Sequence, residues 1–185
     1  GGIDVPRDSR PMHKKPIPRM GGLAIFMGFM AALMIFGRLD AQMLSILLGA
    51  MIIVVLGIFD DIVALGAKFK FCIQIIAAAI PVCIGGLKIE FFTSFNPFSN
   101  DPYFSLGVLS IPVTIIWIVG ITNAVNLIDG LDGLAAGVSS IAAMTMLAVG
   151  LLTNEVMVAI TMAALAGSCI GFLPYNFNPA KIFMG

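Results

Sequence analysis

Six apolar runs without any charged residue constrain the fold of this chain more than any other feature. Each run lacks Asp, Glu, Lys, Arg and His and is roughly 17 to 20 residues long, near the length that a helix needs to cross about 30 Å of hydrocarbon. Only 11% of the residues are charged, and the mean hydropathy is +1.06. The sequence therefore predicts an all-α, polytopic membrane helix bundle, with about six transmembrane helices in a single integral-membrane domain over residues 1–185. The runs are residues 21–37, 43–59, 71–87, 104–121, 134–152 and 156–175.

The distribution of Lys and Arg predicts the orientation of the bundle. If the six spans alternate, one face receives eight basic residues and the other receives only Arg38 and Lys88. Short loops rich in Lys and Arg stay on the cytoplasmic side. We therefore expect a multi-pass protein of the cell inner (plasma) membrane, with residues 1–20 as a basic cytoplasmic loop. The formal net charge is zero, so nucleic-acid binding is not expected. The eight basic residues are Arg7, Arg10, Lys14, Lys15, Arg19, Lys68, Lys70 and Lys181.

Two smaller features add to this expectation. Cys72, Cys83 and Cys169 fall within apolar runs, are odd in number and lack metal-ligand spacing, so buried reduced thiols are predicted. The segment from Glu90 to Tyr103 contains the letters FFTSFNPFSNDPY, whose Pro, Asn and aromatic residues predict an extracytoplasmic loop.

A pair of adjacent acids, Asp60 and Asp61, follows the second apolar run. Neighbouring carboxylates at a helix end repel each other, so a positive group should compensate them. A divalent cation such as Mg²⁺, bound together with phosphate oxygens, is one candidate, and Lys68 or Lys70 is another. Taken alone, the pair is explained equally well by a solvated acidic loop.

A second polar cluster, within the letters TNAVNLIDGLDGLAAG, spaces four Asn and Asp residues three apart. Gly130 and Gly133 predict a helix interrupted by a turn. Oxygen-bearing side chains beside glycines, which allow close backbone approach, favour metal and nucleotide-phosphate binding over packing. The spacing excludes an EF-hand. Counting crossings places this row on the same face as the acidic pair. Its members are Asn123, Asn126, Asp129 and Asp132.

Four motifs in this order resemble the polyprenyl-phosphate N-acetylhexosamine-1-phosphate transferases. They are D-x-P-x-x-x-R-x-x-H-x-x-P-x-P-x-x-G-G, a span ending D-D, N-x-x-N-x-x-D-G-x-D-G, and F-L-x-x-N-x-x-P-A-x-x-F-x-G. The resemblance covers essentially the whole chain. It is closer to the undecaprenyl-phosphate N-acetylglucosamine-1-phosphate transferase branch, which starts teichoic-acid or lipopolysaccharide glycans, than to the phospho-N-acetylmuramoyl-pentapeptide transferases of peptidoglycan synthesis.

The resemblance implies a Mg²⁺-dependent reaction at the membrane, with Mn²⁺ as an alternative cation. A sugar-1-phosphate, expected to be GlcNAc-1-phosphate, would pass from a UDP-N-acetylhexosamine to a polyprenyl (undecaprenyl) phosphate in the lipid bilayer, releasing UMP and initiating cell-wall or surface glycan synthesis. The residue chemistry agrees, because two anionic phosphates repel each other strongly and need a cation between them. Whether the protein forms a homodimer is left open.

Site roles follow by position from the same resemblance. Asp60 and Asp61 would be catalytic, orienting or deprotonating the lipid phosphate, with a covalent intermediate as the alternative. Asn126 and Asp129 would hold the metal. The expected substrate contacts are His13, Asn123, Asp132 and Asn176. In the family, NPAKIFMG leads to a metal-ligating aspartate, so we expect the chain to be an inactive fragment that lacks N- and C-terminal parts of the full enzyme.

Other classes of membrane protein fit the sequence less well. A transporter would line its path with polar groups near the bilayer midplane, whereas a carrier with a polar site at the cytoplasmic side stays as the alternative. A CDP-alcohol phosphatidyltransferase would need an arginine after Asp132-Gly133, and an Asp-rich prenyl transferase would need a third acid after Asp61.

Overall fold

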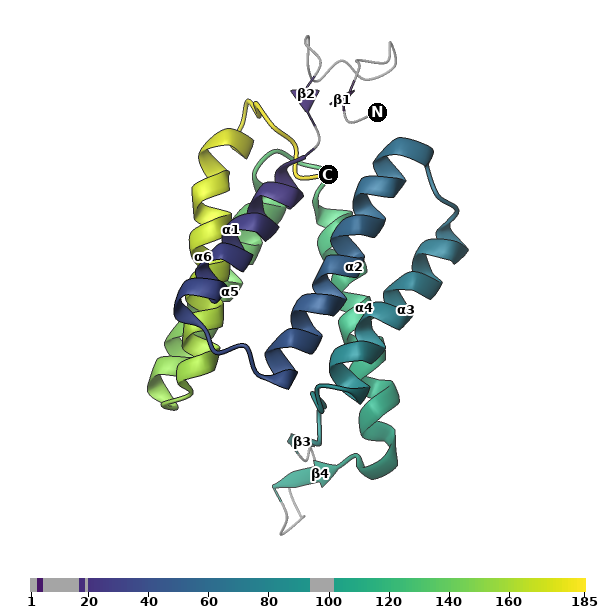
Figure 1. The fold of residues 1–185 in the computed structure, drawn as a ribbon, viewed down its shortest axis with the longest axis vertical. Helices are drawn as coiled ribbons and strands as arrows, with labels where there is room; N and C mark the ends of the chain where they lie inside the picture. The colour runs from purple at the N-terminus through teal and green to yellow at the C-terminus, as the bar shows by residue number, and fades with distance from the viewer. Residues whose placement is uncertain (1–2, 5–16, 19, 94–101) are drawn as a thin grey trace.

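The computed structural model describes residues 3–4, 17–18, 20–93 and 102–185, and it is a bundle of six α-helices (Figure 1). Two short antiparallel hairpins accompany the helices. One joins β1 (Ile3–Asp4) to β2 (Ile17–Pro18), and the other joins β3 (Phe91–Thr93) to β4 (Tyr103–Ser105). The helices are α1 (Gly21–Phe36), α2 (Ala41–Val63), α3 (Ala67–Cys83), α4 (Ser110–Ile128), α5 (Leu134–Leu152) and α6 (Val156–Asn176), with a 3-10 turn, η1 (Gly107–Leu109), before α4.

The predicted polytopic helical bundle is confirmed. Each apolar run of the sequence supplies most of one α-helix, and α2, η1 with α4, α5 and α6 are long and apolar enough to cross a membrane. The helix α1 is apolar but has only 16 residues. The helix α3 has 17 residues and begins with a turn that carries Lys68 and Lys70. The protein is therefore multi-pass, and a count of six complete spans stays a prediction.

The helix α2 begins before and ends after the apolar run 43–59 that predicted it. The Asp40 carboxylate accepts a hydrogen bond from the Met43 N–H at 2.8 Å, so this N-cap starts the helix at Ala41. At the other end the helix continues through Asp60 and Asp61, and it stops at Ala64, whose φ of 51° is left-handed. The acidic pair thus belongs to the last turn of α2, and a rigid helix positions it.

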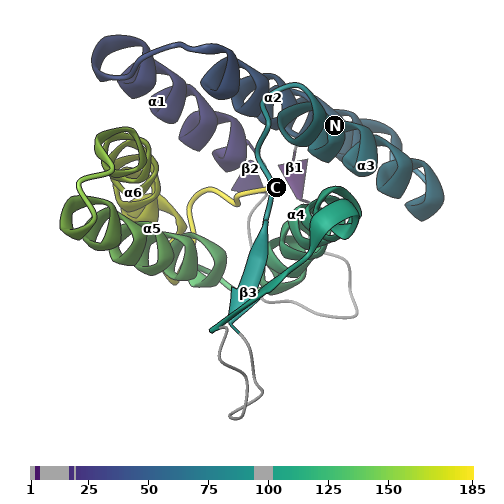
Figure 2. The same cartoon turned by 90° about the horizontal axis from the view of Figure 1, so that it is seen from below.

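The helices pack in two groups. In one group α6 contacts both α5 and α1, and in the other α3 contacts both α2 and α4. Figure 2 shows the groups on either side of the yellow C-terminal segment. Close packing within the second group uses Gly49 of α2, because a Cβ there would lie 2.7 Å from the Ala77 carbonyl oxygen of α3. Phe29 and Leu33 of α1 and Met43 and Leu47 of α2 lie in a buried apolar cluster where the groups meet.

Two expectations outside the site are compared with the structure. The segment predicted as an extracytoplasmic loop has short strands at its two ends, in which Phe91 pairs with Ser105 and the rings of Phe91 and Tyr103 lie 5.1 Å apart. Residues 94–101 between the strands lie outside the described residues, and the loop's side of the membrane stays a prediction. All three cysteines are free, and Cys169 is buried as predicted, but Cys72 and Cys83 are exposed. The prediction of burial was wrong for these two because an apolar helix of a membrane protein has an outer face as well as a packed one.

Candidate active site

The two acidic clusters lie at the same end of the bundle. The C-terminal ends of α2 and α4 both reach this end, where α3 and α5 begin and where the chain's last residues lie (Figure 1). The negative charge of Asp61, on α2, contributes to a raised pKa of Asp129, which follows α4. The structure therefore brings together two acids that the sequence separates by two helices.

Asp60 has an ion-pair partner from α3. Its Oδ2 lies 2.9 Å from Nζ of Lys70, and its Oδ1 accepts a hydrogen bond from the Leu65 N–H at 2.9 Å. Both side chains of the ion pair are about one-third exposed. Of the two lysines that the sequence offered as compensation for the acidic pair, the structure thus uses Lys70. The ion pair fixes the Asp60 carboxylate at the end of α2.

Asp129 occupies the C-cap position of α4, and the pKa of its carboxyl group is shifted. Burial raises its pKa to about 6, a hydrogen bond from the Gly185 backbone opposes the rise, and the charge of Asp61 adds to it. At neutral pH the carboxylate is ionised in surroundings that disfavour its charge. Asn126, one helical turn earlier, is exposed at the same end of α4. A bound cation would relieve the unfavourable charge of Asp129.

Asn123 is bound to α3 by a residue that the sequence analysis did not select. Its Nδ2 donates to Oε1 of Gln74 at 2.7 Å and to the Val119 carbonyl oxygen at 2.8 Å. Gln74 is the one side-chain amide in the apolar run 71–87. An isolated polar side chain in a long apolar run is a functional candidate in a membrane protein, so this isolation was a usable signal.

Asp132 and Asn176 hold the segment 177–185 against the turn between α4 and α5. Oδ2 of Asp132 accepts hydrogen bonds from the Ala180 N–H at 3.0 Å and from Nδ2 of Asn178 at 3.1 Å. Asn176 is only 3% exposed, and its Oδ1 accepts from the Gly133 N–H at 3.1 Å while its Nδ2 donates to the Ile182 carbonyl at 2.9 Å. These bonds give both residues a structural task, and their predicted contacts with substrate stay predictions.

The same segment meets the start of α1. The N–H groups of Gly21 and Gly22 donate to the carbonyls of Phe183 and Met184 at 2.9 and 2.6 Å. The first amides of a helix have no partner within the helix, so these bonds satisfy two of them. A Cβ at Gly21 would lie 2.2 Å from the Phe172 ring. The absence of side chains at Gly21 and Gly22, in the first motif, therefore allows residues of the last motif to contact the start of α1. The sequence alone did not indicate this contact.

The site end of the bundle offers oxygen-bearing side chains of the kind that Mg²⁺ binds. Among the residues that the structure describes, no three His, Cys, Asp or Glu side chains form a metal site by themselves. Mg²⁺ commonly uses only one or two carboxylates and takes its other ligands from water and phosphate. Asp129, with the Asn126 amide one turn earlier on α4, fits that pattern of hard oxygen ligands. His13 lies outside the described residues.

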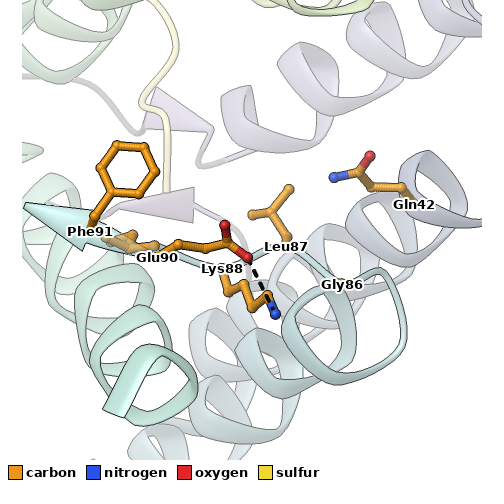
Figure 3. A pocket seen from close by; sticks show the side chains of 7 residues that line it. Gln42, Gly86, Leu87, Lys88, Glu90 and Phe91 are labelled. Carbon is orange, nitrogen blue, oxygen red and sulfur yellow. Dashed lines mark ion pairs between the residues drawn. The ribbon is translucent and has the colours of Figure 1, made fainter. Parts of the chain in front are cut away.

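A hollow of about 520 Å³ lies at the opposite end of the bundle, where α2 begins and α3 ends. Figure 3 shows the ion pair between Lys88 and Glu90, 3.3 Å apart, at its edge. None of the predicted site residues lines it. The other lining residues are Gln42, Gly86, Leu87, Ile89 and Phe91.

Comparisons with known proteins agree with the motifs. A probable undecaprenyl-phosphate N-acetylglucosaminyl 1-phosphate transferase of Bacillus subtilis is 48% identical over the whole chain, which covers 51% of that relative. A decaprenyl-phosphate N-acetylglucosaminephosphotransferase of Mycobacterium leprae is 39% identical over 99% of the chain and 50% of the relative. The chain thus spans about half the length of these curated relatives.

A second branch of relatives is more distant. A phospho-N-acetylmuramoyl-pentapeptide-transferase of Clostridium beijerinckii is 33% identical over the whole chain and 60% of the relative. The chain is therefore more similar to the N-acetylglucosamine-phosphate transferases, as its motifs predicted. The model of a protein family described as glycosyl transferase family 4 matches residues 43–185, which include both acidic clusters and Gln74. On these grounds the chain belongs to glycosyl transferase family 4.

Proposed function

We propose that the protein containing this chain transfers a sugar-1-phosphate from a UDP-N-acetylhexosamine to a polyprenyl phosphate. GlcNAc-1-phosphate and undecaprenyl phosphate are the proposed substrates, after the names of the relatives. The observation that carries the proposal is the position of both acidic clusters at one end of a membrane bundle, where the charge of Asp61 acts on Asp129. Acids at a membrane surface suit a reaction between a water-soluble nucleotide sugar and a lipid phosphate.

The proposed reaction exchanges one phosphoanhydride partner for another. A phosphate oxygen of the polyprenyl phosphate forms a bond to the β-phosphorus of the UDP-sugar, and the bond from that phosphorus to the bridging oxygen breaks, so UMP leaves. Asp60, fixed by Lys70, and Asp61 orient the attacking phosphate or accept its remaining proton. Most of the lipid phosphate has already lost that proton at neutral pH, so the position of the phosphate matters more than the basicity of the aspartates.

A divalent cation would supply charge neutralisation. Asp129 and Asn126 are the residues proposed to hold Mg²⁺, with Mn²⁺ as an alternative, and the bound cation would offset the negative charge of the diphosphate. The raised pKa of Asp129 supports this assignment, because burial makes its ionised form costly without a cation. Asn123 and Asp132, together with His13 and Asn176, are proposed to shape the site around the nucleotide sugar.

We also propose that this end of the bundle faces the cytoplasm, where UDP-sugars are made. Of the described basic residues, Lys68, Lys70 and Lys181 lie at the site end, whereas Arg38 and Lys88 lie at the other end. Cysteines introduced at positions 61 and 126 should then react with a membrane-impermeant reagent only from the cytoplasmic side, in a background without native cysteines. Labelling of the two positions from opposite sides would exclude a shared site.

The activity is tested with full-length protein in lipid nanodiscs, undecaprenyl phosphate and labelled UDP-GlcNAc. Wild type should form labelled lipid and release an equal amount of UMP. Asp61→Asn should lower the rate by at least about 100-fold, the scale of one positioned acid or base. Glu155→Gln, an exposed acid at the other end of the bundle, should keep the rate of wild type. Full turnover by Asp61→Asn would refute the assigned role, and solute flux without UMP release would favour a carrier.

A further inference from the structure

We propose that Gln74 is a positioning residue of this site, which orients the side chain of Asn123 so that its carbonyl oxygen is the atom left for the nucleotide sugar. The inference rests on the proposed function. It goes beyond the four motifs, none of which includes Gln74.

The first argument is the place of Gln74 on α3. Lys70 and Gln74 are four residues apart, so they share one face of the helix. Lys70 contacts Asp60 of α2 at 2.9 Å, and Gln74 contacts Asn123 of α4 at 2.7 Å. One face of α3 therefore holds a residue from each of the two polar clusters. The helix α3 packs against both α2 and α4, so this connection lies within one group of packed helices.

The second argument is the orientation of the Asn123 amide. A carboxamide has two N–H donors and one carbonyl acceptor. The Val119 backbone carbonyl can only accept, so the Asn123 nitrogen must face it at 2.8 Å. The other N–H donates to Oε1 of Gln74. Within residues 20–93 and 102–185, no group donates to Oδ1 of Asn123.

This orientation restricts what Asn123 can recognise. With both N–H groups used, the side chain accepts a hydrogen bond from an N–H or O–H of the nucleotide or the sugar. It has no donor left for a phosphate oxygen. If Gln74 were replaced by an apolar residue, one N–H of a half-buried amide would lack its partner, and side-chain rotation to satisfy it would move the oxygen.

A helix-packing hydrogen bond is the plainer explanation, and it predicts different behaviour. Polar contacts between membrane helices stabilise the bundle modestly, so a packing role would change thermal stability and leave the substrate KM unaltered. A positioning role acts through Asn123. Loss of Gln74 should then change the KM for the nucleotide sugar, and it should change nothing further once Asn123 is gone.

The experiment compares Gln74→Met, Gln74→Glu, Asn123→Ala and the double variant Gln74→Met/Asn123→Ala in full-length protein with labelled UDP-GlcNAc. Methionine keeps the length without a strong acceptor, whereas glutamate keeps an acceptor for the Asn123 amide. Cys72→Ala, an exposed position on the same helix, is the matched control.

We expect Gln74→Met to raise the KM for UDP-GlcNAc by about three- to tenfold, the value of one hydrogen bond, whereas Cys72→Ala should keep the KM of wild type. Gln74→Glu should keep the KM for UDP-GlcNAc near that of wild type. The KM of the double variant should match that of Asn123→Ala within about twofold. A wild-type KM in Gln74→Met, or additive effects in the double variant, overturns the positioning role. A wild type that makes no labelled lipid would instead reject the proposed function.

Discussion

Asp129, which caps the C-terminus of α4, has a pKa raised by its burial, and the negative charge of Asp61 in the last turn of α2 adds to that rise. Burial disfavours the ionised form of Asp129, and the like charge of Asp61 disfavours it further. Such an arrangement is what a site for a divalent cation and a diphosphate requires, and it makes the behaviour of the site depend on pH.

Mg²⁺ should stabilise the protein more at pH 7.5 than at pH 5. The folded-state pKa of Asp129 is raised from 3.8 to about 6, so the folded protein holds this proton more tightly than the unfolded chain does. Its contribution to stability is therefore present below about pH 4 and is lost as pH rises towards about 6. A cation competes with the proton and offsets the loss. Melting temperatures with Mg²⁺ or with EDTA at both pH values measure this effect.

Asp129→Asn is the control for that experiment. The amide does not titrate, so the dependence of the Mg²⁺ effect on pH in this window should largely disappear. An undiminished dependence in Asp129→Asn would assign the titration to another group.

Lys70→Met should reduce the transfer rate by about tenfold, equivalent to about 1.4 kcal/mol, because Asp60 loses the partner that fixes it. The ion pair is partly exposed, so the free energy of unfolding should fall by less than about 1 kcal/mol. Lys68→Met on the same helical turn is the matched control, with a rate near that of wild type. Steady-state rates and thermal unfolding of both variants decide the matter. Equal rates for the two variants would show that the ion pair has no part in the reaction.

Asn176→Ala should destabilise the protein in the absence of any substrate. The change leaves the Gly133 N–H and the Ile182 carbonyl without their partners, at a cost of about 1–3 kcal/mol for each buried group. Asn178→Ala is a milder comparison, since it removes one exposed bond to Asp132. Thermal unfolding of the two variants without nucleotide separates the roles. Unchanged stability in Asn176→Ala would mean that the residue acts only on substrate.

Gly133→Ala should lower stability by about 1–2 kcal/mol, because a residue with a Cβ is strained at its φ of +75°. The new methyl group would also lie 3.3 Å from the Phe177 ring. Gly137→Ala, in α5, meets nothing within 4 Å and should be neutral or stabilising by up to about 1 kcal/mol. Chemical denaturation of both variants gives the comparison, and equal effects would contradict the left-handed turn.

Gly49→Ala should destabilise the packing of α2 on α3. Its methyl group would lie 2.7 Å from the Ala77 carbonyl oxygen, a backbone atom that cannot move by itself, and such overpacking typically costs about 1–3 kcal/mol. Gly57→Ala in the same helix meets nothing within 4 Å and serves as the control. Because α3 carries Lys70 and Gln74, Gly49→Ala should also lower the transfer rate, whereas Gly57→Ala should not. A Gly49→Ala variant as stable as wild type would contradict the close contact.

The sequence by itself determined the helices, the common end of the two acidic clusters and the family. Long uncharged apolar runs have few alternatives in a membrane, and counting them fixes which loops share a face. The regular spacing of oxygen-bearing side chains also identified the polar row from the sequence.

Only the tertiary structure decided which groups contact one another. That Lys70 rather than Lys68 pairs with Asp60, that Gln74 binds Asn123, and that Asn176 fastens the last segment to Gly133 all depend on how helices distant in sequence pack. Hydropathy describes each helix alone and carries no information on its rotation or its neighbours. Hydrogen bonds require contact within about 3 Å, so their partners are fixed only when the helices are packed.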